Sequence, residues 1–291
     1  MGESRTLLRM GSAVFDLSLR THIMGILNVT PDSFSDGGRF TGDRGSSVET
    51  AVESALKMAE EGADIIDIGG ETTKPGAQPV PLDEELARVI PVIEGIRRHS
   101  PVPISIDTYK PEAAKAALEA GADIINDIAA GGYCSDGPGM FALAAATGAP
   151  IMLMHMKGLP RDMQADPRYD DVAAEVRGFL LERAKEAEAA GVAPDKILLD
   201  PGIGFGKNLA HNLTLINRLD ELAATGYPVV LGTSRKAFIG RLTGVSDASD
   251  RVDGTVASSV AGIMKGAKII RVHDVKAAKR AAAVVDAIIR A

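Results

Sequence analysis

Short apolar runs alternate with amphipathic stretches along most of the chain. Eight runs have the composition of buried strands, and they cover residues 22–28, 63–69, 102–107, 122–127, 150–155, 196–200, 228–232 and 267–272. Between them, apolar residues recur with helical spacing at 48–59, 83–98, 111–120, 138–147, 171–190, 208–224, 252–265 and 276–290. This alternation predicts an α/β fold with a parallel sheet. Eight such units predict a (β/α)8 TIM barrel, with a doubly wound open sheet as the alternative.

One phrase recurs along the sequence and supports a repeated unit. EEGADIIDIGG occupies residues 60–70, EAGADIINDI occupies 119–128 and KGAKIIRVHD occupies 265–274. In each segment a glycine follows a helical pattern, as at many helix C-termini, and a short apolar run comes next. Such a run between turn signals is typical of a strand that is buried on both faces.

The residues before the first barrel strand have a different pattern. In residues 1–21, two short segments flank a glycine, Gly11. We expect a small β-hairpin there that closes the bottom of the barrel. No proline-rich or low-complexity linker divides the chain, so we expect a single domain, with the hairpin followed by the barrel in residues 22–291.

The composition excludes several classes of protein. The chain has 32 Lys and Arg residues and 39 Asp and Glu residues, which gives a formal charge of −7. Such a chain, with no basic stripe, is a poor nucleic-acid binder. No apolar run is long enough for a transmembrane helix, and the first residues lack the apolar region of a signal peptide. Cys134 is the one cysteine, so we expect no disulfide framework and a cytoplasmic protein.

Polar residues follow all eight predicted strands. In barrel enzymes the C-terminal ends of the strands form the active-site face. The strand-end residues are Asn28, Gly70–Lys74, Asp107, Asn126-Asp127, His155, Asp200, Ser234–Lys236 and Arg271–His273. The opposite ends carry mostly Gly, Ala, Val and Pro. This asymmetry predicts an enzyme or a small-ligand site.

Two kinds of side chain occur at this rim. Short side chains with acceptor atoms suit a flat heterocycle with several N–H donors, and these are Asp107, Asn126 and Asp200. Cationic side chains suit phosphate groups, and these are Lys74, Arg235, Lys236, Arg271 and His273. Further phosphate ligands would come from Asn28, Thr72, Thr73 and Ser234. The combination suggests a nitrogen heterocycle that carries phosphates.

Each of these residues also has a purely structural interpretation. Asp107 can cap the next helix, Asn126 can form a turn and Asp200 can serve the turn that follows it. Arg235 can be an ordinary surface charge, and His155 can be a satisfied core histidine. Because all of them converge on one rim, we favour the functional interpretation.

The strand-end motifs resemble those of the dihydropteroate synthase family. The matching segments are MGILNVTPDSFSDGG (24–38), DIGGETTKPGA (67–77), SIDTYKPE (105–112), INDI (125–128), LMHMKG (153–158), LDPGIGFGKN (199–208), LGTSRKAFIG (231–240) and IIRVHDV (269–275). The resemblance implies SN1-like condensation of 6-hydroxymethyl-7,8-dihydropterin diphosphate with 4-aminobenzoate, which yields 7,8-dihydropteroate and pyrophosphate. It also implies Mg²⁺ as cofactor, sulfonamide sensitivity and a homodimer.

The resemblance also assigns roles to the matching positions. It implies a pterin site made by Asp107, Asn126, Ile128, Met154, Asp200, Phe205, Lys236 and Arg271. It implies a diphosphate site made by Asn28, Thr72, Lys74, Arg271 and His273, with Asn28 also a ligand of Mg²⁺. It implies an aminobenzoate site made by Phe34, Thr73, Pro75 and Ser234. The catalytic residues that it implies are Asp36, Asp107, Asp200 and Lys236.

Two positions depart from the family pattern. Ser-Thr-Arg usually follows the second strand, whereas this chain has Thr72-Thr73-Lys74. Lysine keeps the charge but loses the planar fork of arginine, so we expect weaker engagement of the diphosphate by this loop. Ala237 follows Lys236 where many members have serine, so a carboxylate contact there would fall to the backbone N–H groups at the start of a helix.

Two further functions fit the sequence. A pterin-binding methyltransferase, which moves a methyl group from methyltetrahydrofolate to a cobalamin protein, would share the barrel and the Asp and Asn contacts. It would not need Asn28 or the cations after the seventh and eighth strands. A non-catalytic relative would bind a pterin without turnover.

Overall fold

The computed structural model describes residues 7–30, 44–71, 78–132, 139–158, 163 and 166–291. Within them, eight parallel strands form one sheet in the order β8-β7-β6-β5-β4-β3-β10-β9. Their bounds are β3 His22–Asn28, β4 Ile65–Gly69, β5 Ile104–Asp107, β6 Ile124–Asp127, β7 Ile151–Met154, β8 Ile197–Asp200, β9 Val230–Leu231 and β10 Ile269–Val272. A parallel bridge between Leu199 and Val229 brings the two edges together. The predicted barrel is confirmed, and the open sheet is wrong.

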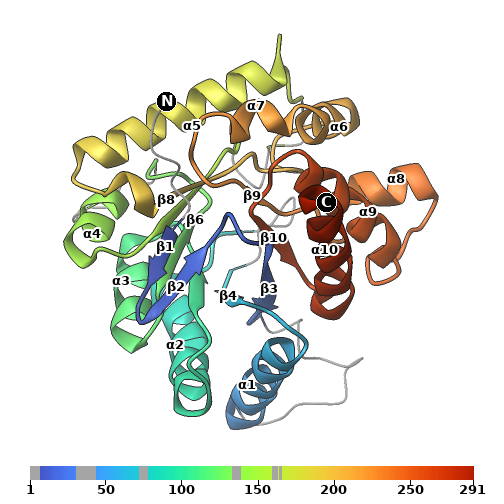
Figure 1. Ribbon diagram of the computed structural model, residues 1–291. Helices are drawn as coiled ribbons and strands as arrows, with labels where there is room; N and C mark the ends of the chain where they lie inside the picture. Colours follow the sequence, from blue (N-terminus) through green and yellow to red (C-terminus); the bar gives the residue numbers. More distant parts are fainter. Residues whose placement is uncertain (1–6, 31–43, 72–77, 133–138, 159–162, 164–165) are drawn as a thin grey trace.

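Helices surround this barrel (Figure 1). Their bounds are α1 Arg44–Glu60, α2 Leu82–His99, α3 Pro111–Ala120, α4 Met140–Thr147, α5 Val172–Ala189, α6 Leu209–Asn217, α7 Leu219–Ala223, α8 Ala237–Thr243, α9 Val252–Met264 and α10 Val275–Arg290; a 3-10 turn, η1, spans Pro194–Lys196. The helix α3 shows how the sequence sets such bounds. It begins with Pro111, which needs no N–H partner there, and it ends at Ala120, before Gly121, whose φ of 115° is left-handed. In the described part of the chain, no helix is both long and apolar enough to cross a membrane.

Two helical features differ from the expectation. The segment 208–224 forms two helices, because the helical conformation is interrupted at Arg218. The Arg218 guanidinium stabilises this break by binding Asp171, the N-cap of α5, at 2.9 Å and Glu221 on α7 at 2.6 Å. A further short helix, α8, lies in the connection after β9. The sequence did not predict α8, because a helix of seven residues is too short to show a clear apolar periodicity.

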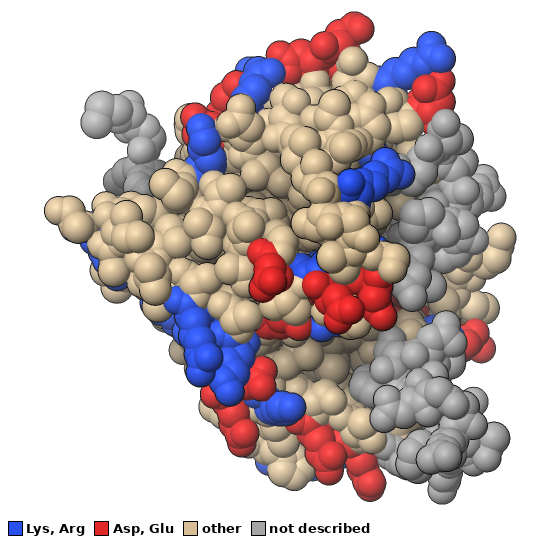
Figure 2. Space-filling model, turned by 90° about the vertical axis from the view of Figure 1, so that its right-hand side faces the viewer, with Lys and Arg blue, Asp and Glu red and all other residues tan. Residues whose placement is uncertain are grey.

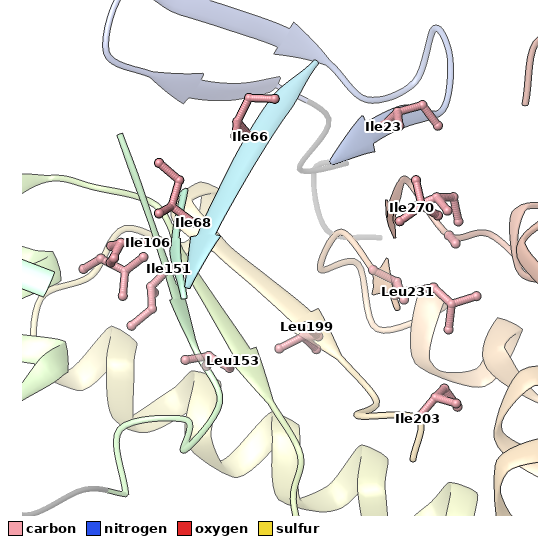
Figure 3. Packing of buried hydrophobic residues seen from close by; sticks show 14 of the residues in the cluster. Ile23, Ile66, Ile68, Ile106, Ile151, Leu153, Leu199, Ile203, Leu231 and Ile270 are labelled. Atoms are coloured by element: carbon pink, nitrogen blue, oxygen red, sulfur yellow. The ribbon is translucent and has the colours of Figure 1, made fainter. Parts of the chain in front are cut away.

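The outward face of the barrel strands packs against the helices. Figure 3 shows part of this apolar layer, with isoleucine and leucine side chains from several strands. Ile66 and Ile68 on β4 and Ile104 and Ile106 on β5 are all fully buried. Because β-branched residues fit a pleated surface that is buried on both faces, the strands read as continuous apolar runs.

The inward face at the bottom of the barrel forms a second, separate apolar cluster. One residue from each of seven strands contributes, namely Met24, Ile65, Ile124, Met152, Leu198, Val230 and Ile269. The predicted hairpin packs on this cluster. Its strands, β1 Leu7–Met10 and β2 Ala13–Asp16, pair antiparallel and cross the middle of the strand ring in Figure 1. Leu8 and Met10 are each 1% exposed in the cluster, so the hairpin closes the bottom of the barrel.

Candidate active site

The inner face of the barrel changes from apolar to polar along the strands. Side chains two residues apart on a strand share one face. Two residues after members of the inner apolar cluster, the strands carry Asp67, Asn126, Met154, Asp200 and Arg271. Asp107 ends β5 and is the register partner of both Gly69 and Asn126. The strands therefore deliver these side chains to the C-terminal end of the barrel interior.

Arg271 lies between two carboxylates at this end. Its Nε donates a hydrogen bond to Asp67 Oδ2 at 2.6 Å, and its Nη2 donates to Asp107 Oδ2 at 2.5 Å. Asn126 Nδ2 donates to the same Asp67 carboxylate at 3.2 Å. The Asp67 side chain is fully buried, whereas the Asp107 side chain is 16% exposed. Asp67 is thus bound within the protein, and Asp107 is the carboxylate that a ligand can reach.

Burial shifts the pKa values of the charged groups at this end. It raises the pKa of Asp107 to about 7, where Arg271 opposes the shift and Asp67 adds to it. It also raises the pKa of Asp200, against the attraction of Lys236. The same burial lowers the pKa of Lys236 to about 8, although Asp200 counteracts it. Asp107 and Lys236 therefore titrate close to neutral pH, as is common for groups in active sites.

Lys236 and Asp200 are both tied to the loop that follows β8. Lys236 Nζ donates to the backbone carbonyl of Ile203 and lies 4.5 Å from the centre of the Phe205 ring. Asp200 Oδ1 accepts a hydrogen bond from Gly202 N at 2.7 Å. One carboxylate oxygen of Asp200 thus fixes the start of the loop.

Ser234 and His273 form a second polar pair, after β9 and β10. The Ser234 Oγ lies 2.9 Å from His273 Nδ1 and accepts from His273 N at 3.1 Å. Burial, with the charges of Arg235 and Arg271, lowers the pKa of His273 to about 4, so this imidazole is neutral at pH 7. Arg235 itself donates to Asp274 through two nitrogens, at 3.0 and 2.7 Å. Its charge is already paired, which favours the structural interpretation of Arg235.

The remaining predicted residues fall into two groups. Asn28 ends β3 as the register partner of Gly69, and its side chain is exposed. Ile128 and Met154 are buried and Phe205 is half-buried. The predicted residues that lie outside the described part of the chain are Phe34, Asp36, Thr72, Thr73, Lys74 and Pro75.

Two buried polar residues of this region were not among the predicted site residues. Asp67 has a readable signal, because a charged residue in an apolar strand shares the inner face with Ile65. Lys207 is 2% exposed and donates to His155 Nδ1 at 2.9 Å. Its signal is weaker, because a lysine at the end of a glycine-rich loop is more often exposed.

Known proteins with similar sequences belong to one family. The sequence matches the family described as pterin binding enzyme over residues 24–273. Dihydropteroate synthase of Escherichia coli K12 is 50% identical over 276 residues, which cover 95% of this chain and 94% of that protein. The chain belongs to the dihydropteroate synthase family of pterin-binding enzymes.

Two solved structures of family members have the same fold as this chain. The Yersinia pestis dihydropteroate synthase in a sulfonamide drug complex has a TM-score of 0.89 at 45% identity, over 98% of this chain and 100% of that chain. The Xanthomonas albilineans dihydropteroate synthase with 4-aminobenzoic acid also has a TM-score of 0.89, at 46% identity, over 98% of this chain and 99% of that chain.

Proposed function

We propose that this chain condenses 6-hydroxymethyl-7,8-dihydropterin diphosphate with 4-aminobenzoate, giving 7,8-dihydropteroate and pyrophosphate in folate biosynthesis. The observation that carries the proposal is one polar cluster in the barrel, made by Asp67, Asp107, Asn126, Asp200 and Arg271. A pterin edge has several N–H donors, which can bind the acceptor oxygens of Asp107, Asn126 and Asp200. A ring without donors would cover these oxygens and leave them unpaired, so the cluster selects a ring with donors.

The pterin ring is proposed to lie across the C-terminal end of the barrel. The groups that bind its edge are Asp107, Asn126, Asp200 and Lys236. Arg271, which Asp67 anchors, is proposed to cover one face of the ring. The apolar lining is Ile128, Met154 and Phe205. Because the pKa of Asp107 is about 7, this group can accept a hydrogen bond as a carboxylate or donate one as an acid.

The diphosphate is proposed to lie toward β3, β9 and β10. The residues that bind it are Asn28, Thr72, Lys74, Arg271 and His273. Ser234 Oγ accepts from the backbone N–H of His273, so we assign its own proton to His273 Nδ1. This assignment leaves an N–H at His273 Nε2, and a neutral histidine then serves the diphosphate as a hydrogen-bond donor.

Mg²⁺ is proposed to bind with the diphosphate at Asn28. The exposed Asn28 side chain offers an amide oxygen at the end of β3. Mg²⁺ prefers oxygen ligands and often combines one or two protein groups with substrate phosphates and waters. Among the described residues, no three His, Cys, Asp or Glu side chains gather to hold a metal, so the substrate itself would complete the ligand set. The ion would neutralise charge on the leaving diphosphate.

The proposed reaction is SN1-like. The bond between the pterin methylene carbon and the diphosphate oxygen breaks, and the oxygen keeps the electron pair. The dihydropterin ring delocalises the positive charge, and the carboxylates of Asp107 and Asp200 stabilise it, with help from Asp36. The amine nitrogen of 4-aminobenzoate then forms the new C–N bond and loses a proton. Its orientation depends on Phe34, Thr73, Pro75 and Ser234.

The direct test is to mix the purified chain with the dihydropterin diphosphate, 4-aminobenzoate and Mg²⁺. We expect dihydropteroate by mass and an equal amount of pyrophosphate, both dependent on Mg²⁺ and competed by a sulfonamide. Asp107→Asn should abolish product, whereas Asp220→Asn, at an exposed carboxylate, should not. Tight pterin binding without product would favour the non-catalytic relative. Methyl transfer from methyltetrahydrofolate would favour the methyltransferase.

We also propose a homodimer that uses the side of the molecule formed by α8, α9 and α10. Five large apolar side chains on these helices are 55–65% exposed, namely Leu242, Met264, Val284, Ile288 and Ile289. Figure 2 shows this side, where uncharged surface predominates between mixed groups of charged residues. Exposed apolar patches of this kind often mark protein interfaces. Light scattering should give twice the chain mass, and Val284→Glu with Ile288→Glu should give the monomer mass.

A single domain over residues 1–291 and a cytoplasmic location complete the proposal. The hairpin and the barrel share one inner apolar cluster, which supports one cooperative unit. A single unfolding transition, coincident for tyrosine fluorescence and circular dichroism, would test the first point. Cell fractionation would test the second.

A further inference from the structure

A buried lysine near the pterin-ring site ties two loops together. Lys207 lies just before α6 and is 2% exposed. Its Nζ donates to His155 Nδ1 at 2.9 Å, to the carbonyl oxygen of His155 at 3.2 Å and to the carbonyl oxygen of Phe205 at 2.9 Å. The three N–H donors of an ammonium group thus meet three acceptors. None of these acceptors is a carboxylate, so the contact is not an ion pair.

The loop between β8 and α6 needs such ties because its backbone is irregular. Gly202, Gly204 and Gly206 have φ values of 66°, 86° and 62°, which are left-handed conformations. A chain of this shape cannot satisfy its N–H and carbonyl groups within a helix or strand. Side chains serve them instead, because Asn212 Oδ1 accepts from Gly204 N at 2.6 Å and the Tyr169 hydroxyl donates to Gly206 O at 2.9 Å.

The same loop positions groups that face the proposed pterin ring. The Ile203 carbonyl accepts from Lys236 Nζ, and the Phe205 ring lies 4.5 Å from that ammonium. The Phe205 carbonyl is one of the three acceptors of Lys207. A displacement of this loop would therefore move both the Phe205 ring and the carbonyl that holds Lys236.

His155 is suited to be a fixed acceptor. It follows β7, is 6% exposed, and packs edge-on against Phe179 at 5.0 Å between ring centres. Burial and the charge of Lys207 lower the pKa of His155 to about 3, so the imidazole is neutral at pH 7. Because Lys207 Nζ donates to Nδ1, we assign the one ring proton to Nε2. Burial and the charge of Lys236 in turn lower the pKa of Lys207 well below its usual value.

A packing role alone does not account for this arrangement. Burial of a lysine amino group costs free energy that an apolar side chain of the same length would not, and here hydrogen bonds to loop acceptors offset that cost. We propose that Lys207, with His155 as its acceptor, is a positioning residue for the pterin-ring site, because it fixes the loop that carries Phe205 and holds Lys236. The inference rests on the proposed function, since it assumes that a pterin binds here.

The test uses the full-length chain, three test variants and one control variant. Lys207→Met keeps the length and the apolar stem but removes the donors. His155→Leu removes the ring acceptor, whereas His155→Asn keeps an acceptor oxygen near the position of Nδ1. Lys115→Met, at a lysine on α3 whose side chain is 63% exposed, is the matched control. Calorimetry measures binding of 6-hydroxymethylpterin and, separately, of pyrophosphate, and thermal unfolding gives Tm.

We expect Lys207→Met and His155→Leu to weaken 6-hydroxymethylpterin binding about tenfold, because buried acceptors or donors lose their partners and the loop shifts. Pyrophosphate binding should stay within about twofold, since His273 and Arg271 are held by other contacts. His155→Asn should restore most of the pterin affinity, and Lys115→Met should behave as the parent chain.

Three results would overturn the inference. They are unchanged pterin affinity in Lys207→Met, equal losses of pterin and pyrophosphate affinity, and a His155→Asn variant as weak as His155→Leu. If Lys207→Met does not fold, the comparison of pterin affinity between His155→Leu and His155→Asn tests the inference, provided that these two variants have the same Tm. A parent chain that does not bind 6-hydroxymethylpterin would overturn the proposed function and this inference with it. If the parent chain binds and one of the three results above is found, only this inference fails.

Discussion

Arg271 and Asp67 pair on the inner face of the barrel at 2.6 Å, although 204 positions separate them in the sequence. The pairing gives Arg271 a partner that no ligand can displace, because the Asp67 side chain is fully buried. Nη2 of the same guanidinium donates to Asp107, which is partly exposed. A ligand that takes Asp107 therefore leaves Arg271 anchored.

We predict that Asp67→Asn lowers the free energy of unfolding by about 1–3 kcal/mol, because Arg271 keeps its charge and loses its buried partner. It should also raise KM for the pterin diphosphate more than it lowers kcat, since Arg271 becomes less well oriented. Urea unfolding and steady-state kinetics measure the two effects. Asp220→Asn, at an exposed carboxylate, is the control, and equal behaviour of the two variants would contradict the assigned role.

Asp107 should make stability depend on pH in an unusual direction. Its pKa is about 7 in the folded chain and near the ordinary value of about 3.9 in the unfolded chain. Between these values the folded state binds more protons, so the Asp107 contribution to stability falls as pH rises. We predict that the Tm of Asp107→Asn minus that of the parent grows from about pH 4 to about pH 7 and is then constant. A difference that shrinks over this window would contradict the raised pKa.

The hairpin should stabilise the barrel without acting on the site. Leu8 is 1% exposed in the inner cluster, whereas its neighbour Leu7 is 46% exposed. We predict that Leu8→Ala costs about 2–5 kcal/mol of unfolding free energy, as buried leucines do, and that Leu7→Ala costs less than about 0.5 kcal/mol. KM for both substrates should be unchanged in each. A Leu8→Ala variant with parent stability would show that the hairpin is not part of the core.

Gly202 should be irreplaceable for two separate reasons. Its φ is 66°, and a Cβ atom there would overlap the carbonyl oxygen of His155. Gly148 has a φ of 68° but open space around a Cβ atom. We predict that Gly148→Ala costs about 1–2 kcal/mol from backbone strain alone. Gly202→Ala should cost clearly more and should also reduce kcat/KM, and similar losses in both variants would mean that the overlap relaxes freely.

Lys74 offers a test that follows from sequence chemistry. Arginine would restore the planar fork that binds a phosphate through two nitrogens. We predict that Lys74→Arg tightens pyrophosphate-dependent binding of 4-aminobenzoate several-fold, measured by calorimetry with pyrophosphate and Mg²⁺ present. Unchanged binding would mean that lysine engages the diphosphate as well as arginine does.

The barrel was predictable because each strand is a short apolar run followed by a polar end. The expected strands extend at most two residues beyond the observed ones at their N-terminal ends, as at 102–107 against Ile104–Asp107. The hairpin was predictable from its position before the first such run. The break at Arg218 was not, because it also depends on a contact with Asp171, 47 positions away, that no local pattern encodes.

The rim residues of the site were predictable for the same reason, and their partners were not. Strand order brings Asp107 beside Asn126, and the sequence already places both at strand ends. Asp67 lies within the strand, so the sequence indicates only that its side chain points inward, and not that it pairs with Arg271. The role of Lys207 depends on a loop conformation with three left-handed glycines, which spacing alone does not specify.

The two-residue offset between the apolar and polar layers of the barrel interior has a consequence for how this gene can vary. Ile65 and Asp67 face inward together because they are two residues apart on one strand, and the same holds for Ile269 and Arg271. A substitution changes one side chain, but a deletion of one codon inside a strand turns every following side chain to the other face. It would send the charges toward the helices and the outer isoleucines into the site. Length changes should therefore be confined to the connections between strands and helices, whatever substitutions the strands accept.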